Sequence, residues 1–350
     1  MIQNMNKYLL ATHRAINLTP KRFEILKKGY QNNWKKIWKQ VDMKQKKNID
    51  PEKLEQELKN LNIKYYVLGE PDYPLALANI KSPPVILFCR GEIQDSDFPS
   101  ISVVGSRKIS SYGKRALEEI VSAIARSNMT IISGLALGAD TLAHKIALEN
   151  NTKTIAVLGN GIDHIYPKFN EKWSEKALKE GKLTLLSEHW PGVKARAEFF
   201  PMRNRIVTGL SIATLIIEAA EKSGSLISAG MALDQNRDVF AVPGEIFSPQ
   251  STGTNRLLAE TKAQAALSGP QILEMLGLQK NQAQQKALKK ALPTTGLEAE
   301  ILKIFQGENK LHINDIIRRS PLESHVTSAT LSLMEIKGWI KNLGNQEFSV

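Results

Sequence analysis

Cysteine is nearly absent from this chain, and its scarcity excludes a disulfide framework. Among 350 residues only Cys89 carries a thiol, so no internal disulfide can form. Cys89 follows the apolar run Val85-Ile86-Leu87-Phe88, where a cysteine is usually a small buried apolar residue rather than a nucleophile. A chain with one thiol suits a reducing compartment, which favours a cytoplasmic protein.

Long apolar runs are also absent. The run at residues 212–217 stops at Glu218, well short of the roughly 20 residues that cross a bilayer. The first residues lack the basic stretch and sustained apolar core of a signal peptide. We therefore expect a cytoplasmic protein with no membrane partner. Because 350 residues is long for one domain, we expect two or three.

Positive charge is plentiful but unevenly distributed. The net charge is +12, and residues 1–70 hold 15 Lys or Arg against 7 Asp or Glu, while the other 280 residues hold 32 against 28. The net positive charge of the chain is therefore no evidence for a nucleic-acid site in residues 71–350. In residues 1–70, Phe23, Tyr30, Trp34 and Ile37 recur at helical spacing with lysines between them. This pattern predicts a small helical domain with a solvated lysine face; the alternative is a dedicated DNA clamp.

Residues 71–278 read as an α/β domain. Residues 71–100 hold five prolines and one short apolar run, at 85–88, which indicates a connector with one strand. Short apolar runs then alternate with amphipathic helical segments, and we expect strands at residues 101–104, 130–132, 154–158, 183–186, 213–217 and 239–242. Apolar strands separated by helices predict a parallel sheet covered on both faces.

The remaining residues predict a linker and a third domain. Residues 279–295 are polar and read as a linker. Residues 296–350 show three helical segments followed by a hairpin pattern, which describes a winged helix. Residues 323–336, where a recognition helix would lie, contain no Arg or Lys. We therefore expect this domain to contact protein or to regulate, rather than to read DNA.

Cations and glycines follow several of the apolar runs. Loops that leave the carboxyl ends of parallel strands converge on one rim, which would here be cationic and rich in glycine and hydroxyl groups. That chemistry suits phosphates. The segments concerned are Gly105-Ser106-Arg107-Lys108, Ser133-Gly134-Leu135-Ala136, Tyr166-Pro167-Lys168-Phe169-Asn170, Phe199-Phe200-Pro201-Met202-Arg203-Asn204-Arg205 and Ser223-Gly224-Ser225.

Two arginines and two phenylalanines on this rim allow more than one interpretation. At a helix start, Arg203 and Arg205 diverge, so they could reach two phosphates, or one phosphate and one carboxylate. Structural ion pairing is the alternative for each. Phe169 and Phe200 could stack on bases, as in single-strand binding, although a phenylalanine after a turn is more often a core residue.

Enzyme motifs match poorly. The spacing of Gly105 and Gly113 does not fit a P-loop, and the GxGxxG pattern that begins at Gly159 ends in His164. Asp140 and His144 share a helical face, but a helix cap and a hydrogen-bonded core histidine explain them better than catalysis or a metal. Glu188 and Glu218 read as partners of Arg203, Arg205 or backbone amides. We predict no catalytic residue, no metal and no cofactor.

Taken together and in order, these segments resemble the DNA-processing protein A (DprA/Smf) family. The resemblance runs from Pro71 to about Leu267. The matching motifs are Val103-Val104-Gly105-Ser106-Arg107, Ser133-Gly134-Leu135-Ala136 with Gly138, Asp140 and His144, Ala156-Val157-Leu158-Gly159 with Gly161, Tyr166-Pro167 with Asn170, Leu186-Ser187-Glu188, Phe200-Pro201-Met202-Arg203-Asn204-Arg205-Ile206, Ser223-Gly224-Ser225-Leu226 and Ala241-Val242-Pro243-Gly244.

The resemblance implies an extended Rossmann-like domain that binds single-stranded DNA without catalysis. It implies a homodimer that protects incoming strands and loads the RecA recombinase during natural transformation, with a sterile-alpha-motif-like domain at residues 1–70. The DNA-binding residues that it implies are Ser106, Arg107, Gly134, Lys168, Asn170, Arg203 and Arg205. The chain departs from the family pattern at Thr261-Lys262-Ala263 and at Ser228. Leu257 and Leu258, after the last strand, are candidates for the dimer face.

Two other functions stay open. A nucleotide phosphoribohydrolase on a similar sheet would need a Pro-Gly-Gly-x-Gly-Thr loop, which Pro243-Gly244-Glu245 lacks. An adaptor would bind RecA through one surface and DNA only through the basic N-terminal helices.

Overall fold

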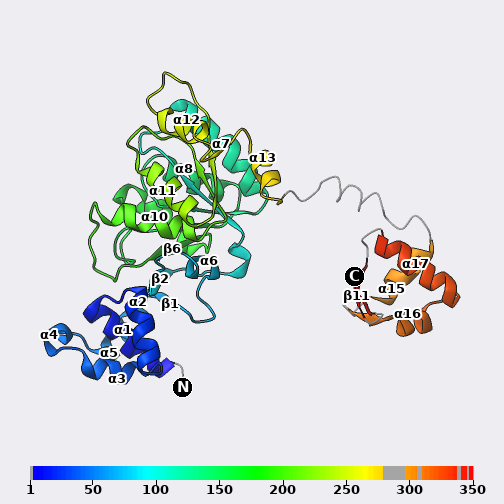
Figure 1. Cartoon of the computed structure of the whole chain (residues 1–350), viewed down its shortest axis with the longest axis horizontal. Helices are drawn as coiled ribbons and strands as arrows, with labels where there is room; N and C mark the ends of the chain where they lie inside the picture. Colours follow the sequence, from blue (N-terminus) through cyan, green and yellow to red (C-terminus); the bar gives the residue numbers. More distant parts are fainter. Residues whose placement is uncertain (1–2, 279–295, 306–309, 337–339, 345–346, 350) are drawn as a thin grey trace. The chain divides into compact units, whose positions relative to one another are not determined.

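The computed structural model describes residues 3–278, 296–305, 310–336, 340–344 and 347–349 (Figure 1). The chain forms two compact units, Met1–Gly277 and Leu278–Val350. The linker expected at residues 279–295 lies outside the described residues. Within the described part of the chain, no helix has both the length and the apolar character to span a membrane.

Five helices open the first unit. Phe23 and Trp34 stack with ring centroids 5.4 Å apart, and both are buried with Ile37, which confirms the helical prediction. Side chains of Thr19 and Asn33 accept hydrogen bonds from the first turns of two helices. The sterile-alpha-motif assignment stays a prediction. The helices are α1 (Gln3–Ile16), α2 (Pro20–Gly29), α3 (Trp34–Gln40), α4 (Met43–Lys46) and α5 (Pro51–Asn60).

A nine-stranded sheet follows, in the order β1-β2-β6-β5-β4-β3-β7-β8-β9. Its strands are β1 (Lys64–Val67), β2 (Ile86–Arg90), β3 (Ser100–Val104), β4 (Thr130–Ser133), β5 (Thr154–Val157), β6 (Leu183–Ser187), β7 (Ala213–Ile216), β8 (Asp238–Ala241) and β9 (Gln264–Ala265). In sheet order from β6 through β5, β4, β3 and β7 to β8, neighbouring strands pair parallel, as predicted. The short strand β9, which was not predicted, pairs parallel with β8. The other two correct the prediction, because β1 lies where only helices were expected and both β1–β2 and β2–β6 pair antiparallel.

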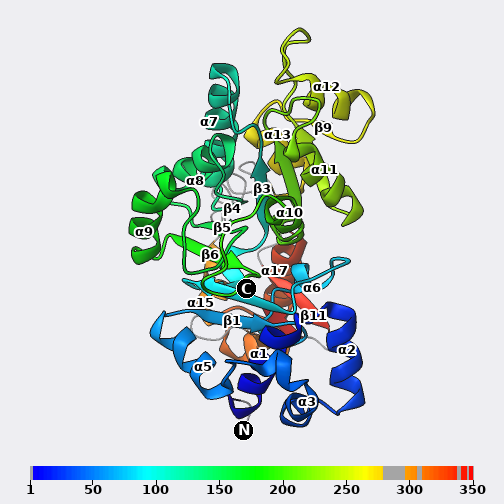
Figure 2. The same cartoon turned by 90° about the vertical axis from the view of Figure 1, so that its left-hand side faces the viewer.

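Helices cover both faces of the sheet. Figure 2 shows α7, α8 and α9 on one side and α10 and α11 on the other. Leu117, Ile120, Val121 and Ile124 of α7 are buried, as their spacing predicts. Every residue of β3 to β7 is buried as well. The remaining helices of this unit are α6 (Leu75–Ala78), α7 (Ser111–Arg126), α8 (Ala139–Glu149), α9 (Glu171–Lys179), α10 (Phe199–Gly209), α11 (Gly224–Asp234), α12 (Thr252–Ala259) and α13 (Gly269–Met275), with short 3₁₀ turns η1 (Asp95–Asp97) and η2 (Lys168–Asn170).

The N-terminal helices and the sheet share one hydrophobic core. Leu10 and Trp34 belong to the same buried cluster as Phe88 and Trp190. At this junction the Trp190 indole Nε1–H donates to His13 Nδ1 at 3.2 Å, and Arg14 lies 5.2 Å from the Trp190 ring. The helices end at Asn60 and the sheet begins at Lys64, before the boundary expected at residue 70, and both belong to one compact unit.

The second unit has its own core, which includes Ile301, Ile316, Leu331 and Phe348. The three helices and the terminal hairpin expected there are present, and β10 joins the hairpin in a three-stranded sheet of order β10-β12-β11. Its winged-helix assignment stays a prediction. The elements are α15 (Gly296–Ile304), β10 (Leu311–His312), α16 (Ile313–Arg319), α17 (Ser324–Ile336), β11 (Lys341–Gly344) and β12 (Glu347–Ser349).

Candidate nucleic-acid interface

The candidate site lies where the sheet changes direction. From β3 the chain builds outward through β4 and β5, and then returns to place β7 and β8 on the other side of β3. In such sheets the connections diverge beside the central strands, which leaves a crevice at their carboxyl ends. A pocket of about 880 Å³ occupies this position, between the loops that follow β3 and β7.

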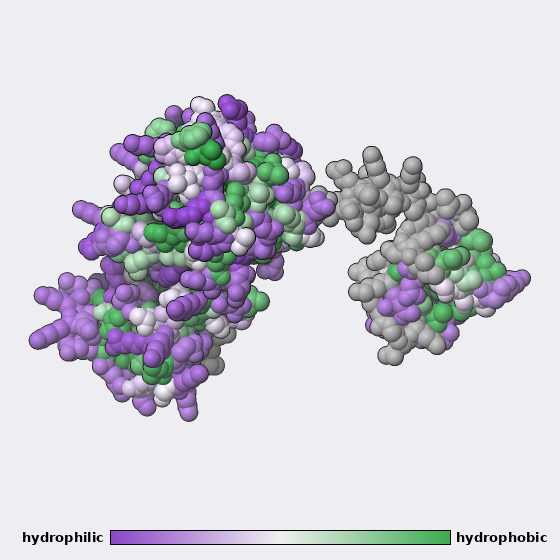
Figure 3. Space-filling view, turned by 45° about the horizontal axis from the view of Figure 1, so that its top comes forward, coloured by the Kyte–Doolittle hydropathy of each residue, from purple (hydrophilic) through white to green (hydrophobic). Residues whose placement is uncertain are grey.

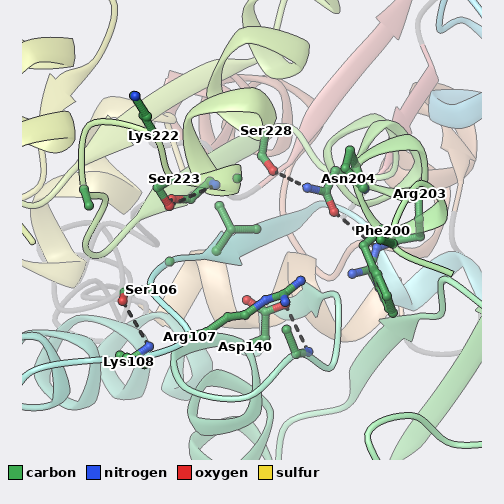
Figure 4. A pocket seen from close by; sticks show the side chains of 18 of the residues that line it. Ser106, Arg107, Lys108, Asp140, Phe200, Arg203, Asn204, Lys222, Ser223 and Ser228 are labelled. Atoms are coloured by element: carbon green, nitrogen blue, oxygen red, sulfur yellow. Dashed lines mark hydrogen bonds between the residues drawn. The ribbon is translucent and has the colours of Figure 1, made fainter. Parts of the chain in front are cut away.

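The pocket has cationic, hydroxyl and aromatic sides. In Figure 4 Arg107 and Asp140 lie on one side, Ser223 and Ser228 on the opposite side, and Phe200 and Arg203 at one end. The lining side chains that bring charge, hydroxyl groups or rings are Ser106, Arg107, Lys108, Asp140, Tyr166, Arg196, Phe200, Arg203, Lys222, Ser223, Ser225 and Ser228.

Arg107 is an exposed cation of the pocket. Among the described residues it makes no ion pair within 4.0 Å. Its guanidinium carbon lies 5.7 Å from the centroid of the Phe200 ring, whose other neighbour is the Tyr166 ring at 5.6 Å. The Ser106 hydroxyl accepts a hydrogen bond from the Lys108 backbone N–H at 3.1 Å, which shapes the turn that presents Arg107. A flat cation over Phe200, next to the Tyr166 ring, forms a surface on which a base or a phosphate can rest.

Arg203 is buried beneath this surface, with 3% of its area exposed. Its Nη1 donates to the carbonyl of Gly134 at 2.6 Å and to that of Val157. These carbonyls follow β4 and end β5, so one guanidinium joins the carboxyl ends of two neighbouring strands. A Cβ on Gly134 would lie 2.2 Å from Arg203 Nη2, so only glycine leaves room for this arrangement.

Asp140 is the carboxylate that faces Arg203. Its Oδ2 accepts hydrogen bonds from the backbone N–H groups of Gly134 and Ala136, at 3.2 and 3.3 Å. Burial raises the pKa of Asp140, and Arg203 opposes that shift. Burial likewise lowers the pKa of Arg203 to about 10, against the pull of Asp140. Asp140 was expected to cap the start of α8, and its side chain instead accepts hydrogen bonds from the loop that precedes this helix.

Asn170 supports the same loop from outside the pocket. Leu135 has a φ of +60°, a left-handed conformation that is costly for a bulky residue. The Asn170 side-chain amide donates to the Leu135 carbonyl and to Thr141 Oγ1, both at 2.9 Å, and Asn170 is fully buried. Asn170 thus holds a strained turn in place.

Arg205 pairs with a carboxylate, which is one of the alternatives that the sequence left open. Its Nη1 and Nη2 donate to Glu188 Oε1 and Oε2 at 2.8 and 2.7 Å, and its Nε donates to the Ser82 carbonyl at 2.9 Å. The predicted role of Glu188 is confirmed. Bidentate pairs of this kind are geometrically specific, and Arg205 does not line the pocket.

Lys168 and Phe169 project from the short turn η2. Lys168 is exposed, and 74% of the Phe169 surface is exposed. Neither residue lines the pocket, although Tyr166, two residues earlier, does. Their exposure leaves both side chains free to extend the binding surface beyond the pocket.

His144 and Glu218 have structural surroundings. His144 Nδ1 lies 2.7 Å from Thr154 Oγ1, inside the core, as expected of a core histidine. Glu218 accepts a hydrogen bond from the Ser110 backbone N–H at 2.9 Å, at the start of α7, which confirms its predicted bond to a backbone amide. Within the described residues, no group of three His, Cys, Asp or Glu could hold a metal ion.

The structure brings Ser106, Arg107, Phe200 and Arg203 together in one pocket, but several lining residues were not predicted. Arg196, Asn204 and Lys222 escaped notice. Lys222 directly precedes Ser223-Gly224-Ser225, so its position after β7 was a usable signal. Arg196 lies in a loop without a recognisable motif, so the sequence gave no signal for its position in the pocket.

This topology and pocket define a class. The order β5-β4-β3-β7-β8-β9 is that of a Rossmann-like sheet, and a pocket lined with cations and hydroxyl groups at its switch point is suited to a phosphorylated ligand.

Comparison with known proteins gives the particular family. Residues 64–277 match the family described as DNA recombination-mediator protein A, and the chain belongs to this family. It is 39% identical to the DNA processing protein DprA of Bacillus subtilis (strain 168) over 210 residues, which is 60% of this chain and 70% of that protein.

Two solved structures resemble the chain. The X-ray structure of DNA processing protein A from Streptococcus pneumoniae matches with a TM-score of 0.68 and 32% identity, over 77% of this chain and 97% of that one. DNA processing protein A from Helicobacter pylori, described for its single-stranded DNA binding mode, matches with a TM-score of 0.55 and 30% identity, over 62% of this chain and 97% of that one.

Proposed function

We propose that this protein binds single-stranded DNA along the rim of its sheet and acts in the cytoplasm as a recombination mediator, not as an enzyme. The observation that carries the proposal is Arg107, an exposed cation over Phe200 in the pocket, which pairs with no carboxylate in the part of the chain that the structure describes. Membership of the recombination-mediator family and the single-strand binding of the Helicobacter pylori relative support the same reading.

The predicted site residues divide into contacts and supports. Ser106, Arg107 and Lys168 contact phosphates, while Phe200 and Phe169 stack on bases. Each phosphate contact adds about 0.7 to the salt dependence of single-strand binding, and each stacked base contributes roughly 1–3 kcal/mol.

The other four residues act mainly by holding these groups in position. Gly134, Asn170 and Arg203 fix the loops after β4 and β5, and Arg203 also presents one edge to the pocket. Arg205 anchors the middle of α10, which begins at Phe199, to Glu188 and Ser82.

A salt series with fluorescent oligothymidine tests the proposal. Arg107→Ala should weaken binding at least tenfold at 0.1 M salt and make the salt dependence shallower by about 0.7, because one phosphate contact is lost. Arg126→Ala, at an exposed arginine on the far end of α7, is the matched control. Equal affinity of the two variants would contradict binding at the rim.

The finer role follows the family. We propose that a homodimer protects incoming single strands and loads RecA on them during natural transformation. Leu257 is 7% exposed and Leu258 is partly buried against the core, so a dimer face here would rest on Leu258. Loss of the dimer in Leu258→Glu, seen by sedimentation, supports that face; an unchanged dimer refutes it.

The phosphoribohydrolase alternative is not favoured by the family match. Release of free base from a nucleoside monophosphate by the purified protein would revive it.

A further inference from the structure

The positive charge of the N-terminal helices is concentrated in one part of them. Residues 20–47, which include α2, α3 and α4, hold ten Lys or Arg and two Asp or Glu. Residues 48–70, which include α5, hold three and five. The N-terminal helices lie at the lower left of the space-filling view, where hydrophilic residues cover the outer edge of the molecule (Figure 3).

Helix stability explains only part of this concentration. Lys27, Lys28, Lys39 and Lys46 lie in last turns, where the helix dipole favours cations, but the first turns differ. The positive end of a helix dipole favours acidic residues in the first turn, yet α2, α3 and α4 have none there. Lys21 and Arg22 lie at the start of α2, and Lys35 and Lys36 at the start of α3. The neighbouring α5 follows the rule, with Glu52 in its first turn and Lys59 in its last.

Carboxylate partners do not explain it either. Among the described residues, no cation of residues 20–47 forms an ion pair within 4.0 Å; the ion pairs made by cations of residues 3–70 involve Lys7, Lys59 and Lys64. Ammonium groups lie over rings instead. Lys35 lies over the Tyr8 ring at 5.9 Å, and three further lysines make such contacts within residues 20–47. They are Lys27 over Phe23 at 5.4 Å, Lys36 over Tyr30 at 6.0 Å and Lys46 over Trp38 at 5.0 Å. A ring attracts a cation but does not neutralise it.

Two contacts tie the ends of these helices together. The Tyr30 hydroxyl donates to Gln40 Oε1, which ties the end of α2 to the end of α3. Lys46 Nζ donates to the Lys39 carbonyl at 3.1 Å, which ties α4 to the same end. We call the lysines of these helices the lysine face, made of Lys27, Lys28, Lys36, Lys39 and Lys46.

We propose that the lysine face binds the sugar–phosphate backbone of duplex DNA, as a second DNA surface separate from the pocket on the rim. A single strand gains much of its affinity by stacking bases on exposed rings. Here Phe23 and Trp34 are buried, and Tyr30 and Trp38 are half-buried beneath lysines. Duplex DNA presents one phosphate charge per roughly 1.7 Å, which suits a cluster of point charges that does not read sequence.

The test is duplex binding by the full chain with and without three of these charges. The variant Lys28→Gln/Lys36→Gln/Lys39→Gln changes exposed side chains only. The control Lys53→Gln/Arg126→Gln/Lys179→Gln removes three exposed charges elsewhere in the same unit. We expect the lysine-face variant to bind a fluorescent 30-base-pair duplex at least tenfold more weakly than the control. Its salt dependence should fall by up to about 2.7, because each duplex phosphate contributes about 0.9.

Parallel measurements separate the possible failures. Oligothymidine binding should be equal in both variants and should be lost only with Arg107→Ala, so failure of the rim and failure of the lysine face give different results. Equal duplex affinity of the two triple variants, with matching thermal unfolding, would overturn the inference. So would a loss confined to anionic phospholipid vesicles, which would assign the face to a membrane surface.

Discussion

Arg107 and Arg203 line the same pocket, but their surroundings give them opposite properties. Arg107 is exposed, whereas Arg203 is 3% exposed and donates to two main-chain carbonyls. A buried charge that loses its partners costs several kcal/mol, so a change at Arg203 alters the whole rim. Loss of DNA binding in an Arg203 variant therefore says little about direct contact unless folding is measured too.

His144 gives the residue-scale prediction. Thr154 Oγ1 donates to the Ile131 carbonyl at 2.6 Å and therefore accepts from the His144 Nδ1–H. Burial, with Arg203 nearby, lowers the pKa of His144 from 6.5 to about 3. Because the folded pKa lies below the unfolded one, the stabilisation is complete above pH 6.5 and is lost as the pH falls towards 3.

Between pH 6.5 and pH 5 this single group should cost about 2 kcal/mol of unfolding free energy. Urea unfolding at both pH values measures it, and His144→Gln should remove that part of the pH dependence. His13, whose pKa burial lowers to about 4, is present in both proteins and cancels in the comparison. Identical pH dependence in the two proteins would contradict the prediction.

At the scale of elements, the start of α7 depends on a carboxylate from the loop after β7. Glu218 accepts from the backbone N–H and the hydroxyl of Ser110, and the Ser110 hydroxyl accepts from the Gly113 N–H at 3.0 Å. A Cβ on Gly113 would lie 2.5 Å from the Glu218 carboxyl carbon. The Glu218 carboxylate thus packs against the first turn of α7, where a side chain at position 113 would not fit.

Glu218→Gln should destabilise the protein by about 1–3 kcal/mol, because the amide turns a donor towards the Ser110 N–H and leaves buried groups unpaired. Thermal unfolding measures the loss. Glu221→Gln, at an exposed position three residues away, should leave the melting temperature unchanged. A melting temperature of Glu218→Gln equal to that of Glu221→Gln would mean that the helix start does not need the charge.

The helices and strands also show which parts of the fold could be predicted from the sequence. The strands β3 to β8 were predictable because buried parallel strands read as uninterrupted apolar runs. β1 was missed because its Lys64-Tyr65-Tyr66 pattern follows directly on basic helices and its pairing with β2 is a tertiary choice. The rim segments were predicted from their positions after apolar runs, and the family resemblance supplied the individual residues. The burial of Arg203 was not predictable, because it depends on carbonyls that follow β4 and end β5.

At the scale of the whole molecule, the two compact units have separate cores. A chain that ends at Gly277 keeps the whole pocket and the lysine face, so it should fold. Its affinity for oligothymidine should lie within about threefold of that of the full chain, a smaller change than the loss of one phosphate contact would cause. Fluorescence anisotropy measures this. Loss of affinity beyond tenfold, in a truncated chain that unfolds cooperatively, would assign part of the site to residues 278–350.

The way in which Arg203 joins the ends of β4 and β5 bears on how fast a ligand can associate. The loops after these strands are already held by a guanidinium, by Asp140 and by Asn170. No rearrangement of this floor has to precede the encounter, so diffusion and electrostatic steering set the association rate. Added salt should therefore slow association, and a higher solution viscosity should lower the association rate constant in inverse proportion.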